Sequence, residues 1–317
     1  MSNIISYTRH ISLLFLCSII LFCTFGCSSK PDTAVTASEQ PQEPRDNTPK
    51  ILTPESSGKI VLGNETVSID ISNTSNGYIV LTYLGSNEKV KFQISAPDET
   101  TYTYLVANYD EPIVYPLTGG NGTYLFTLLE TVDVQKDLYA IAFSQETEVS
   151  ITDEFLPYLT PNVYSYFNNE SASVLKGVEL SKECYSDLDV IEQIYYFVTQ
   201  TITYDEEKAQ SVAYGYIPAP DETLSSEKGI CFDYASLMTA MLRSQQIPTK
   251  LEVGYAGEVY HAWISCYVDE IGWVDNIIEF NGESWSLMDP TLAANNSSSA
   301  VQEYIGDGSK YIVKYTY

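Results

Sequence analysis

The hydrophobic pattern of this chain changes its period after residue 157, and this change limits the folds that the chain can adopt. Between residues 56 and 152, short alternating or β-branched runs recur between turns rich in Asn, Gly, Asp and Ser. From Leu188 to Ile202, apolar residues instead follow one another in steps of three and four, which is the spacing of one helix face. The sequence therefore predicts an all-β region followed by a region that begins with helices.

The all-β region, residues 56–152, has the pattern of a small antiparallel β-sandwich. Strand-like runs such as 66–71 and 77–83 are separated by turns such as the one at 75–77. We find in this region no set of residues that carries chemistry. Because a fold does not by itself supply a site, we expect the region to be a spacer or an accessory module.

The second region, residues 153–317, is predicted to be an α+β domain. A further helix is expected within residues 228–243, with Cys231 in its first turn, because apolar residues share one face from Cys231 to Leu242 and Pro248 stops the helix. Strand-like runs follow, at residues 250–255, 260–268 and 272–280. Helices thus come first and an antiparallel sheet after them.

The N-terminus, residues 1–26, has the features of an export signal. Arg9 precedes a largely apolar stretch, residues 11–25, that is shorter than the roughly 20 residues that a membrane-spanning helix needs. Gly26-Cys27 and the polar run after them resemble the lipobox of bacterial lipoproteins, although Thr24 and Phe25 depart from its usual pattern. We therefore expect lipid attachment at Cys27 and a place on the bacterial cell surface, at the outer face of the cytoplasmic membrane. An uncleaved signal anchor is the alternative.

Residues 27–55 are predicted to be a disordered tether. Five prolines stand there among Ser, Thr, Glu and Gln, with almost no apolar residue before Ile51. A stretch of this composition cannot bury enough apolar surface to order itself. Such a tether would hold the folded regions away from the membrane.

The charge and the histidine count exclude several partners. The chain carries 42 acidic side chains against 16 basic ones, a formal net charge of −26. This charge disfavours nucleic acids and anionic membrane surfaces, because both are negatively charged. Of the two histidines, His10 lies in the signal, so one chain cannot build a multi-histidine metal site. We expect no metal, no cofactor and a monomer.

Three residues of the second region form a candidate catalytic set. Cys231 stands at the expected helix start, where unpaired N–H groups and the helix dipole favour the thiolate. His261, the single histidine left after signal removal, lies in an alternating, strand-like run and can accept or deliver a proton near neutral pH. Asp289, which precedes a proline, is placed to orient the imidazole ring, and Asp275 competes for this role.

The motifs around these residues resemble those of a known family. Gly229-Ile-Cys-Phe-Asp-Tyr-Ala235, Tyr260-His-Ala-Trp263 and Met288-Asp-Pro-Thr291 are similar to the core of the transglutaminase-like superfamily, which has a papain-related fold. The resemblance covers residues 180–292 and keeps the order of the family. It implies that Cys231 is the nucleophile, His261 the base and Asp289 the orienting acid. It also implies a thioester with a glutamine side chain or a peptide carbonyl, whose acyl group passes to an amine or to water.

Two neighbours of His261 on the same strand are expected on opposite faces. Trp263 shares the face of His261 and lines the cleft, unless it packs in the core. Cys266 lies on the other face and is expected to be a buried core thiol. Cys184 precedes a helix, and a disulfide bridge between Cys184 and Cys266 stays open.

The surroundings of Cys231 are less well defined by the sequence. Asp233 follows two residues later and is expected on a different side of the helix. The backbone N–H of Cys231 should belong to the oxyanion hole. Tyr204 and Tyr214 are only guesses for a second donor.

Two functions are compatible with this sequence. The first is a surface-anchored cysteine enzyme acting on a protein or peptide amide, including cell-wall peptide, as a peptidase or amidase or as a transglutaminase-type cross-linker. We favour water as the acceptor, since no acceptor-binding feature is visible. The second is a non-catalytic lipoprotein that binds peptide or cell-wall material. An aligned nucleophile and base speak against it, because a pure binder needs neither.

Overall fold

The computed structural model describes residues 45–106, 111–269, 271–275, 278–280, 285–287 and 311–317. The predicted signal 1–26, the lipidation site Cys27 and the orienting acid Asp289 lie outside the described residues. In the part of the chain that the structure describes, none of the helices has the length and apolar character needed to cross a membrane.

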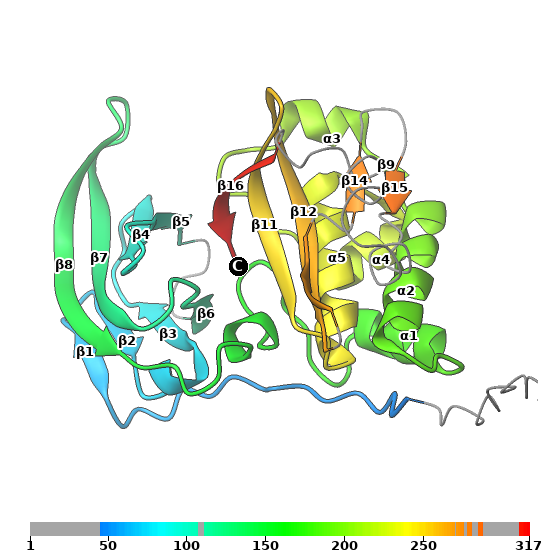
Figure 1. The fold of residues 1–317 in the computed structure, drawn as a ribbon. Helices are drawn as coiled ribbons and strands as arrows, with labels where there is room; N and C mark the ends of the chain where they lie inside the picture. Colours follow the sequence, from blue (N-terminus) through cyan, green and yellow to red (C-terminus); the bar gives the residue numbers. More distant parts are fainter. Residues whose placement is uncertain (1–44, 107–110, 270, 276–277, 281–284, 288–310) are drawn as a thin grey trace, which may run out of the picture. The chain divides into compact units, whose positions relative to one another are not determined.

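The all-β region contains two four-stranded antiparallel sheets (Figure 1). The first sheet has the strand order β1 (Val61–Gly63), β2 (Val67–Asp70), β3 (Tyr78–Tyr83) and β6 (Ile113–Pro116). The second sheet has the strand order β5 (Thr101–Leu105), β4 (Val90–Ser95), β7 (Gly122–Asp133) and β8 (Leu138–Val149). A short 3₁₀ helix, η1 (Thr74–Asn76), precedes β3, and Gly77 ends it with a left-handed φ of 77°.

Buried aromatic side chains join the two sheets. Along β4, Val90, Phe92 and Ile94 are buried and alternate with less buried polar residues, as a strand with one face in a core requires. The ring centroid of Phe92 lies 5.1 Å from that of Tyr115 in β6, and the ring centroid of Tyr104 in β5 lies 4.6 Å from the same ring. Side chains of both sheets therefore meet in a common core, which is compatible with the predicted β-sandwich.

The second region combines helices with a mainly antiparallel sheet, which confirms the predicted α+β class. Its helices are η2 (Leu156–Tyr158), α1 (Ala172–Ser181), α2 (Asp187–Thr201), α3 (Glu206–Ser211), α4 (Pro220–Ser226) and α5 (Cys231–Ser244). Its main sheet has the order β13 (Gly272–Val274), β12 (Val259–Val268), β11 (Thr249–Ala256) and β16 (Tyr311–Thr316). The short pairs are β9 (Thr203–Tyr204), parallel to β10 (Lys228–Gly229), and β14 (Ile278–Phe280), antiparallel to β15 (Trp285–Leu287).

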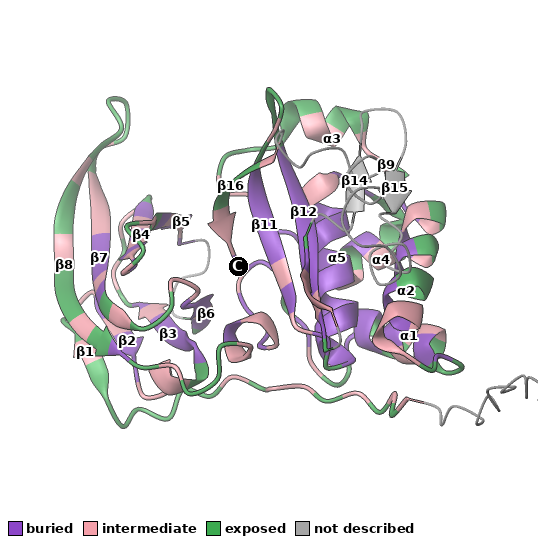
Figure 2. Cartoon of the chain, viewed as in Figure 1, coloured by how far each residue is buried: buried purple, intermediate pink, exposed green. Residues whose placement is uncertain are grey.

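Helix α5 is the centre of the second region. It packs against β11 and β12 and against α1, α2 and α4, and every residue from Asp233 to Ser244 is buried (Figure 2). Apolar and small side chains run all round this helix, which is the composition of a helix enclosed by other elements. The helix expected within residues 228–243 is thus confirmed, and Cys231 lies in its first turn, as predicted.

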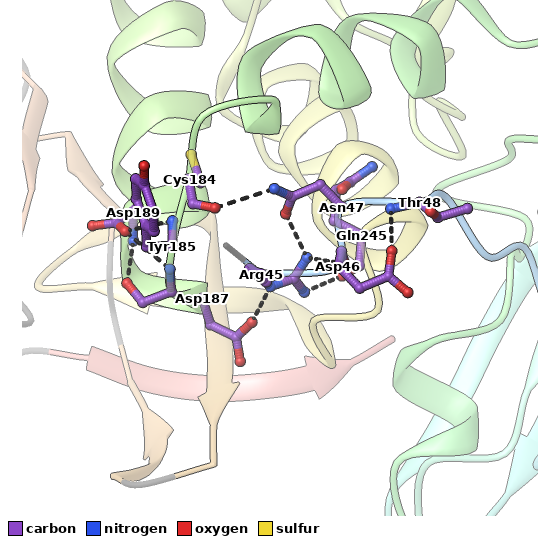
Figure 3. A network of polar contacts seen from close by, with 10 residues as sticks. Arg45, Asp46, Asn47, Thr48, Cys184, Tyr185, Asp187, Asp189 and Gln245 are labelled. Atoms are coloured by element: carbon purple, nitrogen blue, oxygen red, sulfur yellow. Dashed lines mark hydrogen bonds and ion pairs between the residues drawn. The ribbon is translucent and has the colours of Figure 1, made fainter. Parts of the chain in front are cut away.

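A segment that we call the strap, residues 45–51, lies against the helical region (Figure 3). The Arg45 guanidinium pairs with the carboxylate of Asp187, the first residue of α2, at 2.6 Å. It also donates to the backbone carbonyl of Gln245, just after α5. A cation at this position suits the carbonyl groups that the last turn of a helix leaves without intrahelical donors.

Two further hydrogen bonds fasten the strap. The amide of Asn47 donates to the carbonyl of Cys184 at 3.2 Å, and the N–H of Lys50 donates to the carbonyl of Ser244 at 2.9 Å. The strap falls within the tether that the sequence predicts for residues 27–55. Residues 45–51 are therefore not a disordered tether, because they bind the helical region through backbone carbonyls near helix ends. Residues 27–44 of the predicted tether lie outside the described residues.

Arg243, near the end of α5, is buried and donates to backbone carbonyls of separate segments. Its guanidinium reaches the carbonyl of Thr249 at 3.0 and 2.8 Å, that of Thr160 at 2.8 Å and that of Tyr317 at 2.8 Å. A buried guanidinium is tolerated only when its donors find acceptors. This side chain therefore ties the segment before α1, the start of β11 and the end of β16 to the central helix.

Candidate active site

Cys231 is the first residue of α5, as predicted. Ile230 before it is extended, and the chain reaches the helix from β10, which pairs with β9. The N–H of Asp205 donates to the carbonyl of Gly229 at 2.9 Å and fastens this approach. The Cys231 side chain therefore stands at the N-terminal end of a buried helix, where the first N–H groups have no intrahelical partner.

The Cys231 thiol lies beside a small cavity between α5 and β12, lined also by Met238, Ala262 and Ile264. Burial raises the pKa of the thiol, and the N–H of Ala262, which donates to the sulfur, opposes this. The N–H of Phe232 in the first helical turn also lowers the pKa, as the sequence predicts. The expectation of a resting thiolate is nevertheless wrong, because the loss of water around the sulfur outweighs these hydrogen bonds.

His261 stands on β12 immediately before Ala262, so its backbone lies next to the Cys231 sulfur. Its side chain is 6% exposed, and its ring centroid lies 6.3 Å from that of Trp263 at an interplanar angle of 27°. Burial lowers the pKa of His261 to about 4, so the ring is neutral at pH 7. Its Nε2 atom is buried without a hydrogen-bond partner among the described residues, and no hydrogen bond in that part of the chain joins it to the thiol.

Trp263 combines the two roles between which the sequence left a choice, since it is buried in the core and also lines the cavity beside Cys231. Its exposed fraction is 1%. Its indole N–H donates to the carboxylate of Glu252 on β11 at 2.8 Å, and the hydroxyl of Ser265 donates to the same oxygen at 2.6 Å. Burial raises the pKa of Glu252. Trp263 therefore lies beside the ring of His261 and is itself held by a buried carboxyl group.

Asp233 forms a buried network that sequence reasoning missed. Its carboxylate is 0% exposed and accepts hydrogen bonds from the N–H of Ile230 at 2.8 Å, from the Lys208 ammonium at 2.6 Å and from the Tyr216 hydroxyl at 2.5 Å. One signal was available, because an acidic residue at the third helical position can accept from the N–H of the residue before the helix. Lys208 and Tyr216 come from other segments, and no sequence pattern links them to Asp233.

The third member of the predicted catalytic set is not tested by the described structure. Asp289 lies outside the described residues, so its role as the orienting acid stays a prediction. Its competitor Asp275 is described and exposed.

Cys184 and Cys266 are both free, which answers the open question of a bridge between them. Cys266 is fully buried, as predicted, with its sulfur 3.8 Å from the hydroxyl of Thr249. Burial raises the pKa of Cys266 to about 12. Cys184 is also buried, and its thiol donates to the carbonyl of Leu180 at 3.6 Å. Cys231 therefore differs from both in standing at a helix start next to a histidine.

The two tyrosines guessed as oxyanion donors lie in different surroundings. Tyr204, on β9, is half-buried, and burial raises its pKa to about 12, with a contribution from the nearby Cys231. Tyr214 is 73% exposed. Of the two, Tyr204 is the one that the structure brings near the sulfur.

Among the described residues, no group of three or more His, Cys, Asp and Glu side chains is arranged to hold a metal ion.

Residues 177–276 match the family model of the transglutaminase-like superfamily. The matched range contains Cys231 and His261 and ends before Asp289. A protein of Methanocaldococcus jannaschii, UPF0252 protein MJ1282, is 32% identical over 91 residues, which cover 25% of this chain and 26% of that protein. The chain thus spans about a quarter of the length of this relative.

Two solved structures show a distant likeness. A candidate cysteine protease of Cytophaga hutchinsonii is 17% identical with a TM-score of 0.35, over 68% of this chain and 67% of that one. The periplasmic domain of TgpA from Pseudomonas aeruginosa, bound to ethylmercury, is 14% identical with a TM-score of 0.30, over 67% of this chain and 95% of that one. At this distance, neither likeness carries an argument about chemistry.

Proposed function

Because this chain contains a transglutaminase-like domain at residues 177–276, we propose that it is a cysteine enzyme in which Cys231 forms a thioester with a protein or peptide amide. The position of the sulfur supports this most directly. At the start of α5, the Cys231 sulfur accepts a hydrogen bond from the N–H of Ala262, the neighbour of His261. A nucleophile and a base are thus supplied by two elements that pack together.

His261 acts as the base in this proposal. Its pKa of about 4 leaves the ring neutral at pH 7, so Nε2, which has no hydrogen-bond partner among the described residues, can take a proton. The Cys231 thiol needs such a base, because burial raises its pKa and keeps the proton on sulfur. For the transfer, the ring has to approach the thiol, since no hydrogen bond joins them in the described residues.

The bond changes follow from this proton transfer. The sulfur attacks the carbonyl carbon of the amide, and the carbonyl oxygen becomes an oxyanion next to the N–H of Cys231. The C–N bond then breaks, the leaving amine takes the proton from the imidazolium, and a thioester remains. Water or a second amine cleaves the thioester and restores the thiol. Asp289 is proposed to orient the ring through its other nitrogen.

Hydrolysis is the outcome that we favour, with protein or peptide, including cell-wall peptide, as the substrate. We also propose that the protein is lipid-anchored at Cys27 on the outer face of the cytoplasmic membrane of a bacterium. The residues from Cys27 to Arg45 span at most about 60 Å when fully extended. Substrates within that distance of the membrane would then be accessible.

Product analysis tests the enzyme proposal. The mature protein, residues 27–317, is incubated with casein and a labelled primary amine, and peptide release and amine incorporation are followed by mass spectrometry. We expect peptide release that Cys231→Ala abolishes and that Cys184→Ala, which removes a buried thiol elsewhere, retains. Incorporation without cleavage would replace hydrolysis by transamidation. Neither product, with Cys231→Ala indistinguishable from the wild type, would contradict the enzyme proposal.

One observation favours a second candidate, a non-catalytic lipoprotein that binds peptide or cell-wall material. The Cys231 thiol has a raised pKa and is not hydrogen-bonded to His261 within the described residues. Alkylation with iodoacetamide separates the two candidates. If His261→Ala slows alkylation of Cys231, the histidine activates the thiol and the enzyme is favoured. An unchanged rate favours the binding protein.

A further inference from the structure

The geometry points to Asp233, Lys208 and Tyr216 as a positioning triad, which holds the turn before Cys231 and fastens the segment around α3 to it. The role of the triad in catalysis rests on the proposed function of Cys231. Its effect on the thiol itself does not, because that effect is measurable without a substrate.

The three side chains form a closed triangle of hydrogen bonds. The Lys208 ammonium donates to Asp233 Oδ2 at 2.6 Å and to the Tyr216 hydroxyl at 2.7 Å, and that hydroxyl donates to Asp233 Oδ1 at 2.5 Å. The Lys208 nitrogen also lies 4.3 Å from the centroid of the Tyr216 ring. A fully buried carboxylate is costly unless each oxygen is paired, and here both oxygens are paired.

The triangle holds the turn that delivers Cys231. Asp233 Oδ2 accepts the N–H of Ile230 at 2.8 Å. The approach is so close at Gly229 that a Cβ atom there would lie 2.7 Å from the Cβ of Asp233. Residues 229–233 therefore form a tight unit in which the backbone before the nucleophile is set by the carboxylate after it.

This unit and Lys228 just before it bind the segment around α3 at both of its ends. Before α3, the Asp205 carboxylate forms an ion pair with Lys228 at 3.2 Å and caps α3 by accepting the N–H of Lys208 at 2.9 Å. After α3, Tyr216 returns to Asp233. Residues 203–216 and 227–233 are thus joined by side chains as well as by the pairing of β9 with β10.

Charge connects the triad with the sulfur. The Asp233 carboxylate raises the pKa of the Cys231 thiol, because a nearby negative charge disfavours a thiolate. The Lys208 ammonium lies 2.6 Å from that carboxylate, and its positive charge opposes the effect of the carboxylate on the thiol. Removing Lys208 alone should therefore make the thiolate less stable, and removing the charge of Asp233 alone should make it more stable. A merely structural role predicts no such opposite signs.

Other titratable groups near the sulfur leave this reasoning unchanged. Tyr204 on β9 and Tyr260 on β12 lie close enough to Cys231 to interact with it, and burial raises the pKa of both phenols. They are therefore uncharged below about pH 10. His261 is neutral above its pKa of about 4. Near pH 8, the charges that vary among the proposed variants are those of Asp233 and Lys208.

Titration of the thiol tests the triad in the full mature chain. Thiolate absorbance at 240 nm is followed against pH, with Cys231→Ala subtracted, and alkylation of Cys231 is timed by mass spectrometry at pH 8. We expect Lys208→Met to lower the thiolate fraction at pH 8 by about three- to tenfold and Asp233→Asn to raise it. The double variant should return to within about twofold of the wild type, as should Tyr216→Phe, which removes no charge.

The control and the contrary outcome are well defined. Lys176→Met removes a lysine that pairs with Glu179 on the surface of α1 and should leave the titration unchanged. If Lys208→Met and Asp233→Asn move the titration in the same direction, or if neither moves it more than Lys176→Met, the triad does not act on the thiol. If Asp233→Asn fails to fold, Lys208→Met and Tyr216→Phe still decide. The titration does not depend on product formation. Failure of the enzyme proposal can therefore be distinguished from failure of the proposed effect of the triad on the thiol.

Discussion

The two ends of α5 are held in different ways. At the N-terminal end, a carboxylate of the helix itself, Asp233, is paired with side chains only 17 and 25 residues away in sequence. At the C-terminal end, the carbonyl of Gln245 receives the guanidinium of Arg45, which comes from 200 residues earlier. Both ends follow the helix dipole, with an anion at the start and a cation at the end.

Because the two ends of α5 are held differently, we expect one end to influence the reactivity of Cys231 and the other to influence the stability of the fold. The N-terminal end carries the candidate nucleophile and is tied to nearby segments by a charge network. The C-terminal end gathers distant parts of the chain through Arg45 and Arg243. Changes at the C-terminal end should therefore act on the free energy of unfolding, and changes at the N-terminal end on the Cys231 thiol.

The largest effect is expected at the C-terminal end, from Arg243→Met. It removes the side-chain donors of the buried Thr160 and Thr249 carbonyls and leaves the Tyr317 carbonyl, among the described residues, with the N–H of Leu251 alone, so the free energy of unfolding should fall by roughly 3–5 kcal/mol. Urea unfolding measures the loss, and Arg243→Lys, which keeps some donors, should lose less. The titration of the Cys231 thiol should stay within about twofold of the wild type. If Arg243→Met shifted the titration of the Cys231 thiol and left the urea midpoint of unfolding unchanged, the two ends of α5 would not differ in the way described.

The stability of the folded chain should depend on pH through His261, which lies on β12 beside the N-terminal end of α5. Burial lowers the pKa of His261 to about 4 from 6.5. The folded state therefore binds this proton less well than the unfolded state, so the associated stability is full above pH 6.5 and is lost as the pH falls to 4. The loss amounts to roughly 3 kcal/mol.

The variant His261→Gln isolates this contribution. Glu252, whose pKa burial raises, contributes with the opposite sign and is present in both proteins. The fall in the free energy of unfolding between pH 7 and pH 4 should therefore be smaller in His261→Gln than in the wild type. Equal falls in the two proteins would show that His261 is not the group that burial keeps neutral.

A methyl group placed at Gly229 should disturb both stability and reactivity. Its Cβ would lie 2.7 Å from the Cβ of Asp233, so the turn before Cys231 has to shift. We expect Gly229→Ala to lower the free energy of unfolding by about 2 kcal/mol and to change the alkylation rate of Cys231. Gly177→Ala in α1 is the matched control, because its Cβ would meet Met241 no closer than 3.4 Å. A similar outcome for both variants would contradict the tight packing of the turn.

The smallest effect is expected for the strap. Arg45→Gln removes a partly buried ion pair with Asp187 and a donor to Gln245, and should lower the free energy of unfolding by about 1 kcal/mol. A double-mutant cycle with Asp187→Asn measures the part that belongs to the pair. If Arg45→Gln unfolds at the same urea concentration as the wild type, the strap adds nothing to the C-terminal end.

Regular periodicity is what made the fold predictable. The strand-like run at 250–255 corresponds to β11, which is one residue longer at each end, and the run at 260–268 corresponds to β12, which begins one residue earlier. Helix α5 was predicted from its apolar face. The short helix α3 was not predicted, because none of its residues is buried and no apolar face marks it. The strap was assigned to a disordered tether, since its composition does not reveal hydrogen bonds to distant carbonyls.

At the candidate site, residue identity was more predictable than charge state. Cys231 and His261 could be singled out, because a helix start and an alternating strand leave local patterns. The raised pKa of the thiol could not be foreseen, since it depends on how much water the surrounding elements exclude. The partners of Asp233 were missed for a similar reason, as Lys208 and Tyr216 reach it only through the tertiary fold.

The position of the strap determines how the molecule would carry mechanical tension. A pull transmitted along residues 27–44, as from the proposed lipid at Cys27, reaches the described structure at Arg45 and is resisted by Asp187 and the Gln245 carbonyl. Helix α5 has 14 residues and is therefore about 21 Å long. The force would enter the domain at the end of this helix opposite to Cys231, so the helix length separates the point of attachment from the candidate nucleophile.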